Sequence, residues 1–401
     1  MKRVLVIVTA FLTLAAGAQG AGRRPLLAVL GNPPSARLAF VDAVSLEPVG
    51  RTVELGRYGW PSARSPDGSR LVLAAQQPAG LRLVDLHRMR AVGALSLRGH
   101  SDVEALAWVS SRRVLVAGSH FVEGVDPQAR RVLWTRTWPQ SYEGVERSAH
   151  GLVFLVPSAT GIGPTTLVYV DANGEARSVL LDRIQSGFHQ DDRDDAFIGE
   201  GRRPGLAIDM AGNRAFVVGA GDPLAEVDLG AMSVAYHGGP RALAKALRGP
   251  TRTARWLGNG FIAVTGEDSR AWIDAQGHEQ EIDTPAGLTL VDTDDWTSRR
   301  IDSTSAGVAV GDGLMLGYSW SWDSTTGKAS GTGLVGYALE GTRRFHVLQG
   351  ALGLVQVGSG IGYAWPSADT ADGRVSLVDL ATGHLLRTGT VPSPVFLLAT
   401  S

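Results

Sequence analysis

The feature that most constrains the fold of this chain is a short motif that recurs along most of its length. In each copy an apolar stretch ends in an aspartate, and a turn and a more polar stretch follow. The copies are Phe40-Val41-Asp42, Leu83-Val84-Asp85, Gly124-Val125-Asp126, Tyr169-Val170-Asp171, Glu226-Val227-Asp228, Leu290-Val291-Asp292, a degenerate Gly336-Tyr337-Ala338, and Leu377-Val378-Asp379. Their successive spacings are 43, 41, 45, 57, 64, 46 and 41 residues. A basal repeat of about 40–45 residues is the length of four short strands with their turns.

One complete repeat, Pro61–Leu97, shows what each copy contains. It opens on the turn sequence Ser65-Pro66-Asp67-Gly68, and two apolar strands and a more exposed strand follow. A single four-stranded meander cannot bury both of its faces, so each copy needs another on either side. The sequence therefore predicts an all-β fold, a single β-propeller of four-stranded blades over residues 25–401. Counting the motifs gives eight blades, with seven as the alternative.

The two ends of the chain predict how the ring closes. The first copy has only three strands, and its missing strand is supplied in this interpretation by Pro394–Thr400, after the last motif. Pairing the C-terminal strand with the N-terminal blade leaves no open sheet edge, and open edges promote aggregation.

The first 20 residues read as a signal peptide. Lys2 and Arg3 precede the apolar run Val4–Ala16, and small residues follow. No later run has the length of a membrane span. The 401 residues include no cysteine, which excludes disulfides, and the net charge of −1 gives no footprint for nucleic acid. We therefore expect a secreted or periplasmic protein, and favour a monomer.

The repeats resemble a known group. Ser65-Pro66-Asp67-Gly68 with the strand after it, and the repeated Val-Asp ending, are similar to the YVTN-type repeats of secreted bacterial proteins. These belong with propellers like the heavy chain of quinoprotein amine dehydrogenase. Gly99-His100 also resembles the opening of WD repeats, although the Trp-Asp ending is missing at the strand ends. The resemblance implies a β-propeller and carries over no catalytic residue.

Three insertions interrupt the repeat: Ser186–Gly205, Gly239–Pro250 and Glu267–Pro285. The second has helix propensity between two Gly-Pro pairs, and the third suggests a small hairpin inside the sixth blade. Because they fall in neighbouring repeats, we expect them to form one binding face for a protein or cell-envelope ligand. The alternatives are a propeller enzyme (a lyase, hydrolase or quinone-dependent oxidoreductase) with a cation at the central channel, and a purely architectural module.

The first insertion holds the densest cluster of candidate site residues, which are His189, Asp191, Asp192, Asp194 and Asp195. Clustered carboxylates suit Ca²⁺, so the four aspartates are candidate ligands, but the spacing of an EF-hand loop is absent. A solvated loop with arginine counter-charges is the alternative.

Two further pairs are candidates for binding a ligand. Tyr236 and His237 end a strand directly before the second insertion, where a histidine is either a general base or ligand, or a turn-capping residue. Trp320 and Trp322 share one side of a possible strand, so they are candidates for an aromatic platform, with core packing as the alternative.

Overall fold

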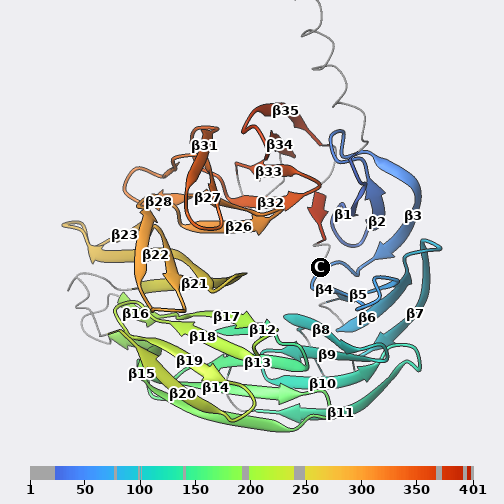
Figure 1. The fold of residues 1–401 in the computed structure, drawn as a ribbon, viewed down its shortest axis with the longest axis horizontal. Coiled ribbons are helices and arrows are strands. Elements are labelled where there is room, and N and C mark those ends of the chain that lie inside the picture. Colours follow the sequence, from blue (N-terminus) through green and yellow to red (C-terminus); the bar gives the residue numbers. More distant parts are fainter. Residues whose placement is uncertain are drawn as a thin grey trace, which may run out of the picture.

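The computed structural model describes residues 23–75, 79–97, 100, 102–138, 141–191, 198–238, 249–366, 373–391 and 395–398. Within these ranges every regular element is a β-strand, so the prediction of an all-β chain is confirmed for them. The strands form eight antiparallel sheets placed around a common centre (Figure 1). The predicted signal peptide lies outside the described residues and stays a prediction.

The first four sheets follow the repeat closely. The first sheet contains β1 (Leu26–Leu30), β2 (Ala36–Val41), β3 (Pro48–Gly56) and β36 (Val395–Leu397), and the second contains β4 (Ser62–Arg64), β5 (Arg70–Ala75), β6 (Gly80–Asp85) and β7 (Arg90–Ser96). The third sheet contains β8 (Ala105–Ser110), β9 (Arg113–Gly118), β10 (Phe121–Asp126) and β11 (Arg131–Thr137). The fourth sheet has a fifth strand and contains β12 (Gly144–Arg147), β13 (Gly151–Val156), β14 (Gly163–Asp171), β15 (Ala176–Asp191) and β16 (Ile198–Arg202).

The last four sheets include one enlarged to seven strands. The fifth sheet contains β17 (Gly205–Asp209), β18 (Arg214–Val218), β19 (Leu224–Asp228) and β20 (Ser233–His237). The sixth sheet is the enlarged one and contains β21 (Gly249–Gly258), β22 (Phe261–Ile273), β23 (Glu279–Pro285), β24 (Leu288–Asp292) and β25 (Ser298–Asp302), with β28 (Ser321–Asp323) and β29 (Lys328–Ser330). The seventh sheet contains β26 (Gly307–Gly311), β27 (Leu314–Tyr318), β30 (Leu334–Ala338) and β31 (Arg343–Val347), and the eighth contains β32 (Leu354–Gly358), β33 (Ile361–Trp365), β34 (Arg374–Asp379) and β35 (Leu385–Thr390).

The last described strand belongs to the first sheet. β36 pairs with β1 in antiparallel register, with Ala28 opposite Leu397 and Leu30 opposite Val395. The Nε2 of Gln356, on β32, donates to the carbonyl of Leu397 at 3.0 Å. The strand expected from Pro394–Thr400 is therefore present at Val395–Leu397, and it occupies the innermost position of that sheet.

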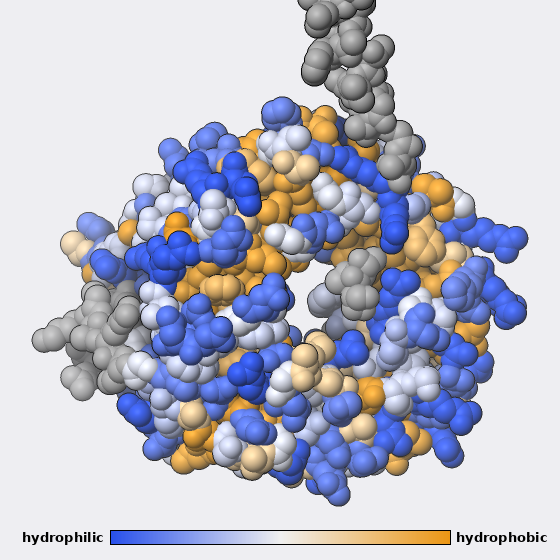
Figure 2. All heavy atoms as spheres, in the orientation of Figure 1, coloured by the Kyte–Doolittle hydropathy of each residue, from blue (hydrophilic) through white to orange (hydrophobic). Residues whose placement is uncertain are grey.

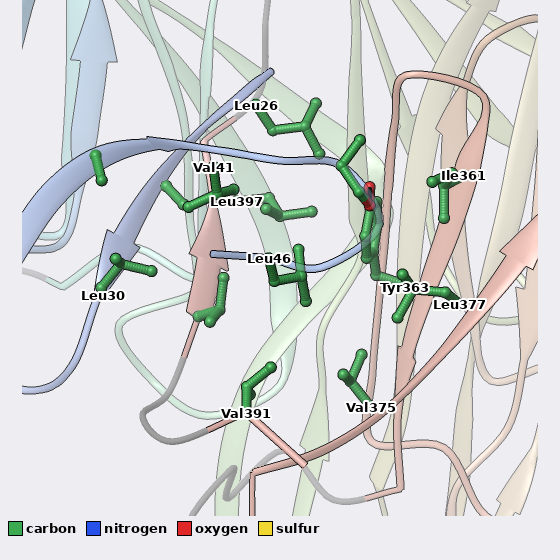
Figure 3. Packing of buried hydrophobic residues seen from close by; sticks show 14 of the residues in the cluster. Leu26, Leu30, Val41, Leu46, Ile361, Tyr363, Val375, Leu377, Val391 and Leu397 are labelled. Carbon is green, nitrogen blue, oxygen red and sulfur yellow. Dashed lines mark hydrogen bonds between the residues drawn. The ribbon is translucent and has the colours of Figure 1, made fainter. Parts of the chain in front are cut away.

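Apolar side chains fill the spaces between neighbouring sheets. The buried residues form eight clusters, and each cluster joins two sheets that follow one another in the chain or, in one case, the last sheet and the first. In that last cluster Leu26 and Val41 of the first sheet pack with Ile361 and Tyr363 of the last (Figure 3). The phenol of Tyr363 donates to the carbonyl of Ala43 at 2.7 Å. Each fully buried apolar side chain contributes about 1.5–3 kcal/mol, so these contacts hold the sheets together.

The aspartate of the repeated motif stabilises a turn. The Oδ1 of Asp42 accepts hydrogen bonds from the N–H groups of Val44 and Ser45 at 2.9 and 2.8 Å. These bonds hold the pKa of Asp42 below its usual value. The same pair of contacts is made by Asp126, Asp228 and Asp379. The motif therefore recurs for a structural reason, because a carboxylate that accepts these bonds favours a tight turn between two strands.

The connections between strands lie at two opposite ends of the sheets, because successive strands run in opposite directions. The aspartate turns lie at one end, which we call the turn face: residues 42–47, 86–89, 127–130, 172–175, 229–232, 293–297, 339–342 and 380–384. At the other end the chain passes from the second strand of a repeat to the third, and from one repeat to the next. We call this end the hairpin face, after the extended hairpins β15–β16, β22–β23 and β28–β29 that leave the sheets there.

Candidate functional site

The first predicted insertion, Ser186–Gly205, is a strand hairpin and not a loop in its described parts. β15 continues past its sheet to Asp191 and pairs with β16, with His189 opposite Glu200. The hydroxyl of Thr165, on β14, donates to the Oγ of Ser186 at 2.7 Å in a fully buried contact, which holds the base of the hairpin. Thr165 and Ser186 lie 21 residues apart in the sequence, and no local pattern predicts their contact.

The structure places only part of the predicted acidic cluster. His189 is exposed on β15, and Asp191 is the last residue of that strand. Asp192, Asp194 and Asp195 lie outside the described residues, so Ca²⁺ binding there stays a prediction. Within the described ranges, no group of three or more acidic or histidine side chains is placed to hold a metal ion.

Of the other two insertions, the third also reaches the hairpin face. Residues 239–248 lie outside the described part of the chain, so the short helix expected in Gly239–Pro250 stays a prediction; the described strand β21 begins at Gly249. The hairpin expected in Glu267–Pro285 is confirmed, because β22 and β23 pair from Glu267 to Pro285. It is joined by β28 of the next repeat, with Ile282 opposite Asp323.

Tryptophan side chains lie exposed on this joined pair of hairpins. The rings of Trp320 and Trp322 are nearly parallel, with centroids 6.2 Å apart, and both side chains are more than a third exposed. Trp272 on β22 is exposed to the same degree. Trp320 also lines a hollow of about 280 Å³ with Glu267 and Tyr318. Burial, with Asp283 nearby, raises the pKa of Glu267.

Tyr236 and His237 do not form one site, because neighbouring residues of a strand point to opposite sides of its sheet. The phenol of Tyr236 donates to Asp182 of the preceding sheet at 2.7 Å. His237 faces the following sheet, where its ring stacks on Trp296 with centroids 3.4 Å apart. Its Nε2 lies 3.0 Å from Glu226.

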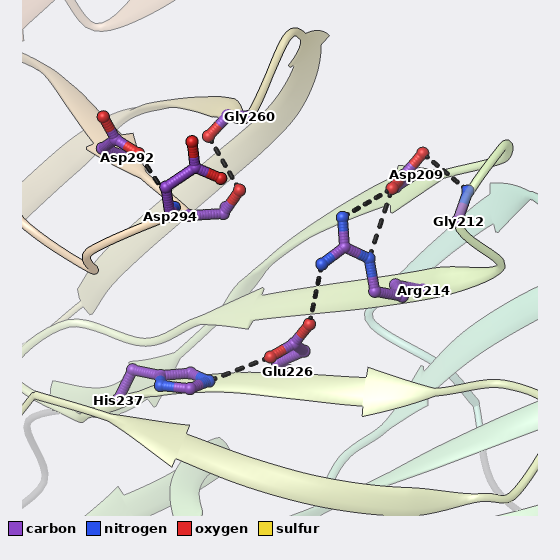
Figure 4. Close-up of polar contacts among 9 residues, drawn as sticks. Asp209, Gly212, Arg214, Glu226, His237, Gly260, Asp292 and Asp294 are labelled. Atoms are coloured by element: carbon purple, nitrogen blue, oxygen red, sulfur yellow. Dashed lines mark hydrogen bonds and ion pairs between the residues drawn. The ribbon is translucent and has the colours of Figure 1, made fainter.

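His237 is the end of a polar network across one sheet (Figure 4). The other carboxylate oxygen of Glu226 accepts a hydrogen bond from Arg214 at 3.0 Å, and Arg214 also donates to Asp209 at 2.8 Å. The guanidinium of Arg214 lies over the rings of Phe216 and Trp256. The network gives hydrogen-bond partners to the charged groups of Asp209, Arg214 and Glu226. This indicates a stabilising role for His237 rather than a catalytic one.

We expect His237→Ala to lower the free energy of unfolding by roughly 1–3 kcal/mol, since it removes a ring stack and a hydrogen bond. His237→Phe should recover part of this loss, because it keeps the stack and loses only the polar contact. Chemical denaturation of both variants measures the effect. If His237→Ala unfolded like the unaltered protein, the structural interpretation would be wrong.

The centre of the molecule holds a cavity of about 640 Å³. Figure 2 shows the opening in the middle of the ring. The innermost strands supply most of its wall, and its described lining comes from β1, β12, β17, β21, β26, β27, β32 and β36, with Trp60, Met210 and Leu398. Apolar side chains predominate, and the charged ones are Glu146, Arg147 and Arg255.

Sequence reasoning missed these charged side chains. Glu146 and Arg147 lie on β12, and Arg255 lies on β21, two innermost strands more than 100 residues apart in the chain. The charges are visible in the sequence, but both strands also contain other polar or small residues, so these three side chains do not stand out there. Only the arrangement of the sheets shows that they face one cavity.

Buried polar atoms without a hydrogen-bond partner gather around β12. In the part of the chain that the structure describes they include one carboxylate oxygen of Glu143 and the Nε of Arg147. Burial raises the pKa of Glu143 to about 7, although Arg203 and the N–H of Gly187 oppose the shift. An unsatisfied buried polar group costs about 1–3 kcal/mol, so this strand is an energetically costly part of the channel wall.

Comparison with solved structures identifies the fold. The chain is similar to the dihydro-heme d1 dehydrogenase NirN in complex with DHE, with a TM-score of 0.57 and 13% identity over 92% of this chain and 75% of that chain. It is also similar to AztD from Citrobacter koseri, with a TM-score of 0.51 and 12% identity over 94% and 97% of the two chains. A third similar structure is quinohemoprotein alcohol dehydrogenase from Comamonas testosteroni, with a TM-score of 0.50 and 10% identity over 80% and 65%.

These neighbours are β-propellers, so the predicted fold class is confirmed at that level. Identities this low show the fold alone. No protein-family model and no curated protein sequence matches this chain. Among the described residues there is no helix long and apolar enough to cross a membrane.

Proposed function

We propose that this chain is an exported binding protein that holds a protein or cell-envelope ligand on its hairpin face. In this proposal the scaffold is a monomeric, eight-bladed propeller closed by β36, related to the YVTN-type repeat proteins. The eight sheets, and the clusters that join them in succession, support this blade count. Residues 1–20 pass from basic residues through an apolar run to small residues, which is the order found in signal peptides. This order supports export to the periplasm or the medium.

The observation that carries the binding proposal is the shared position of the described hairpins. Strand direction puts all three at the same end of the sheets, and two of them are joined by the pairing of β23 with β28. The N–H of Glu281 donates to the Ser324 hydroxyl at 2.7 Å, which reinforces this junction. Exposed tryptophans on such a junction offer large contact areas with little entropy to lose. The turn face, by contrast, consists mainly of short turns.

The runner-up is a propeller enzyme that works at the central channel with a bound cation such as Ca²⁺. Two arginines and one glutamate line the described part of the channel, and this balance of charge favours an anion over a cation. We therefore place the binding function on the hairpin face.

Site-specific photocrosslinking in the producing cell tests the proposal. The crosslinker p-benzoylphenylalanine replaces Trp272 or Trp322 on the hairpin face, and Val44 or Leu385 on the turn face in matched controls. All four side chains are exposed by more than a third, so each position accepts the probe. We expect adducts of discrete mass from the hairpin-face positions only. Adducts equally frequent from both faces, or from neither, would overturn the proposal.

The partner identified in this way then allows a quantitative test. We expect Trp320→Ala combined with Trp322→Ala to weaken its binding roughly 30-fold, since buried aromatic anchors of an interface contribute about 2 kcal/mol or more. Leu385→Ala should leave the affinity unchanged. Isothermal titration calorimetry measures both, and an unchanged affinity in the double variant would place the contact elsewhere.

A further inference from the structure

The wall of the channel cavity mixes apolar side chains with polar groups, two of which are cationic. Leu206, Ile208, Val308 and Leu354 line it from three innermost strands, and the indole of Trp256 is part of its wall. Its volume of about 640 Å³ lies within the range of sites for small organic ligands, about 300–1,000 Å³. Such sites are mostly apolar and fix the ligand with a few polar groups.

The arginines of the cavity differ from many others in the protein. At the turn face Arg113, Arg130 and Arg177 each donate to a backbone carbonyl of a neighbouring sheet, at distances of 2.6–2.9 Å. Within the described residues the Nε of Arg147 has no hydrogen-bond partner, and the exposed side chain of Arg255 makes no hydrogen bond or ion pair with the protein. The Nε of Arg147 is also shielded from solvent, so water does not satisfy it. Burial alone lowers the pKa of this guanidinium, with no acceptor to offset the cost.

The other polar groups that line the cavity, Glu146 and Tyr318, leave its net charge positive. The side chain of Glu146 is exposed to solvent. Burial of its carboxyl by the surrounding protein nevertheless raises the pKa of this group, and the positive charge of Arg255 opposes that shift only in part. Tyr318 presents a phenol to the same cavity and has no hydrogen-bond partner in the described structure. Two guanidinium groups against one carboxyl attract an anion and repel a divalent cation.

We infer that the central channel is a binding site for a small organic anion with a flat apolar body, whose acidic groups pair with Arg147 and Arg255. A guanidinium binds a carboxylate or phosphate oxygen pair in a bidentate manner, and in a cavity walled by protein such pairs are strong. The body of the ligand would pack on the apolar innermost strands and on Trp256. This site is separate from the hairpin face and does not depend on the function proposed for that face.

The test uses two rigid probes of equal size and opposite charge, naphthalene-2,6-dicarboxylate and 2,6-bis(aminomethyl)naphthalene. We expect the full-length mature protein to bind the dicarboxylate at one site by isothermal titration calorimetry, and to bind the diamine at least tenfold more weakly. The inference is overturned if the diamine binds as tightly as the dicarboxylate. It is overturned equally if the dicarboxylate shows no binding at millimolar concentration.

Single variants locate the site. Arg147→Gln and Arg255→Gln should each weaken the dicarboxylate at least tenfold, and Glu146→Gln should strengthen it, because a competing carboxylate is removed. Arg112→Gln makes the same change of charge at an exposed position away from the cavity, and should leave binding unchanged. Arg255→Lys keeps the charge and should restore part of the affinity, which separates lost charge from lost folding. If Arg255→Gln changed the affinity less than twofold while the protein stayed folded, the assignment would be wrong.

Discussion

Deletion of the last eight residues, 394–401, is expected to destabilise this protein more than any other small change proposed here. The deletion removes β36, the innermost strand of the first sheet, and leaves the hydrogen-bonding edge of β1 open. It also removes Val395, Leu397 and Leu398, which are almost fully buried. At about 1.5–3 kcal/mol for each side chain, we expect a loss of roughly 5 kcal/mol in the free energy of unfolding. An open edge also promotes aggregation.

Thermal denaturation and light scattering measure this effect, and a shorter deletion is the matched control. Deletion of residues 399–401 alone keeps the pairing of β36 and the burial of Leu398, so we expect it to behave like the unaltered protein. Leu397→Ala should lie between the two, with a loss of about 2–4 kcal/mol. If the eight-residue deletion melted at the original temperature, the pairing of β36 with β1 would contribute nothing to stability.

Much of the fold could be predicted because its signals are local. Four aspartates of the repeated motif accept hydrogen bonds from the N–H groups two and three residues ahead, so the spacing of the motif reports the spacing of the turns directly. The hairpin of β22 and β23 was predicted for the same reason, since both strands lie within one short segment. The extension of β15 was not predicted: it pairs with β16 from Gly187 to Asp191, and its base is held by the buried contact between Thr165 and Ser186.

The candidate site was less predictable, because it depends on which side of a strand each residue faces and on which strands meet. Tyr236 and His237 are adjacent in the sequence, yet they contact different neighbouring sheets. The two-residue period of a strand would have separated them, once both were assigned to one strand. Trp320 and Trp322 are two residues apart, so the same period places them on one side of the chain, and their rings are nearly parallel in the structure. Arg147 and Arg255 line one cavity only because the sheets surround it, and no spacing in the sequence encodes that.

The second large effect is expected from Glu143→Gln, and it depends on pH. Glu143 directly precedes β12, and one of its carboxylate oxygens is buried without a partner. Burial raises the pKa of this carboxyl from 4.5 to about 7. The unfolded chain therefore releases its proton at lower pH than the folded protein does, so Glu143 reduces stability progressively as the pH rises between these two values. Glutamine has nearly the same shape and carries no charge, so it avoids this cost.

We expect Glu143→Gln to have nearly unchanged stability well below the unfolded pKa and to be more stable than the unaltered protein at pH 8. The gain should be roughly 2–3 kcal/mol above about pH 7.5, allowing for partial exposure of the side chain to solvent. Urea denaturation at about pH 3.5, 5, 6.5 and 8 measures the difference between the two proteins, which cancels the titration of all other groups. Glu175→Gln, at an exposed turn position, is the matched control and should show no such trend. A variant that was less stable at pH 8, or a difference independent of pH, would mean that Glu143 is stabilised as a charge, with Arg203 outweighing the effect of burial.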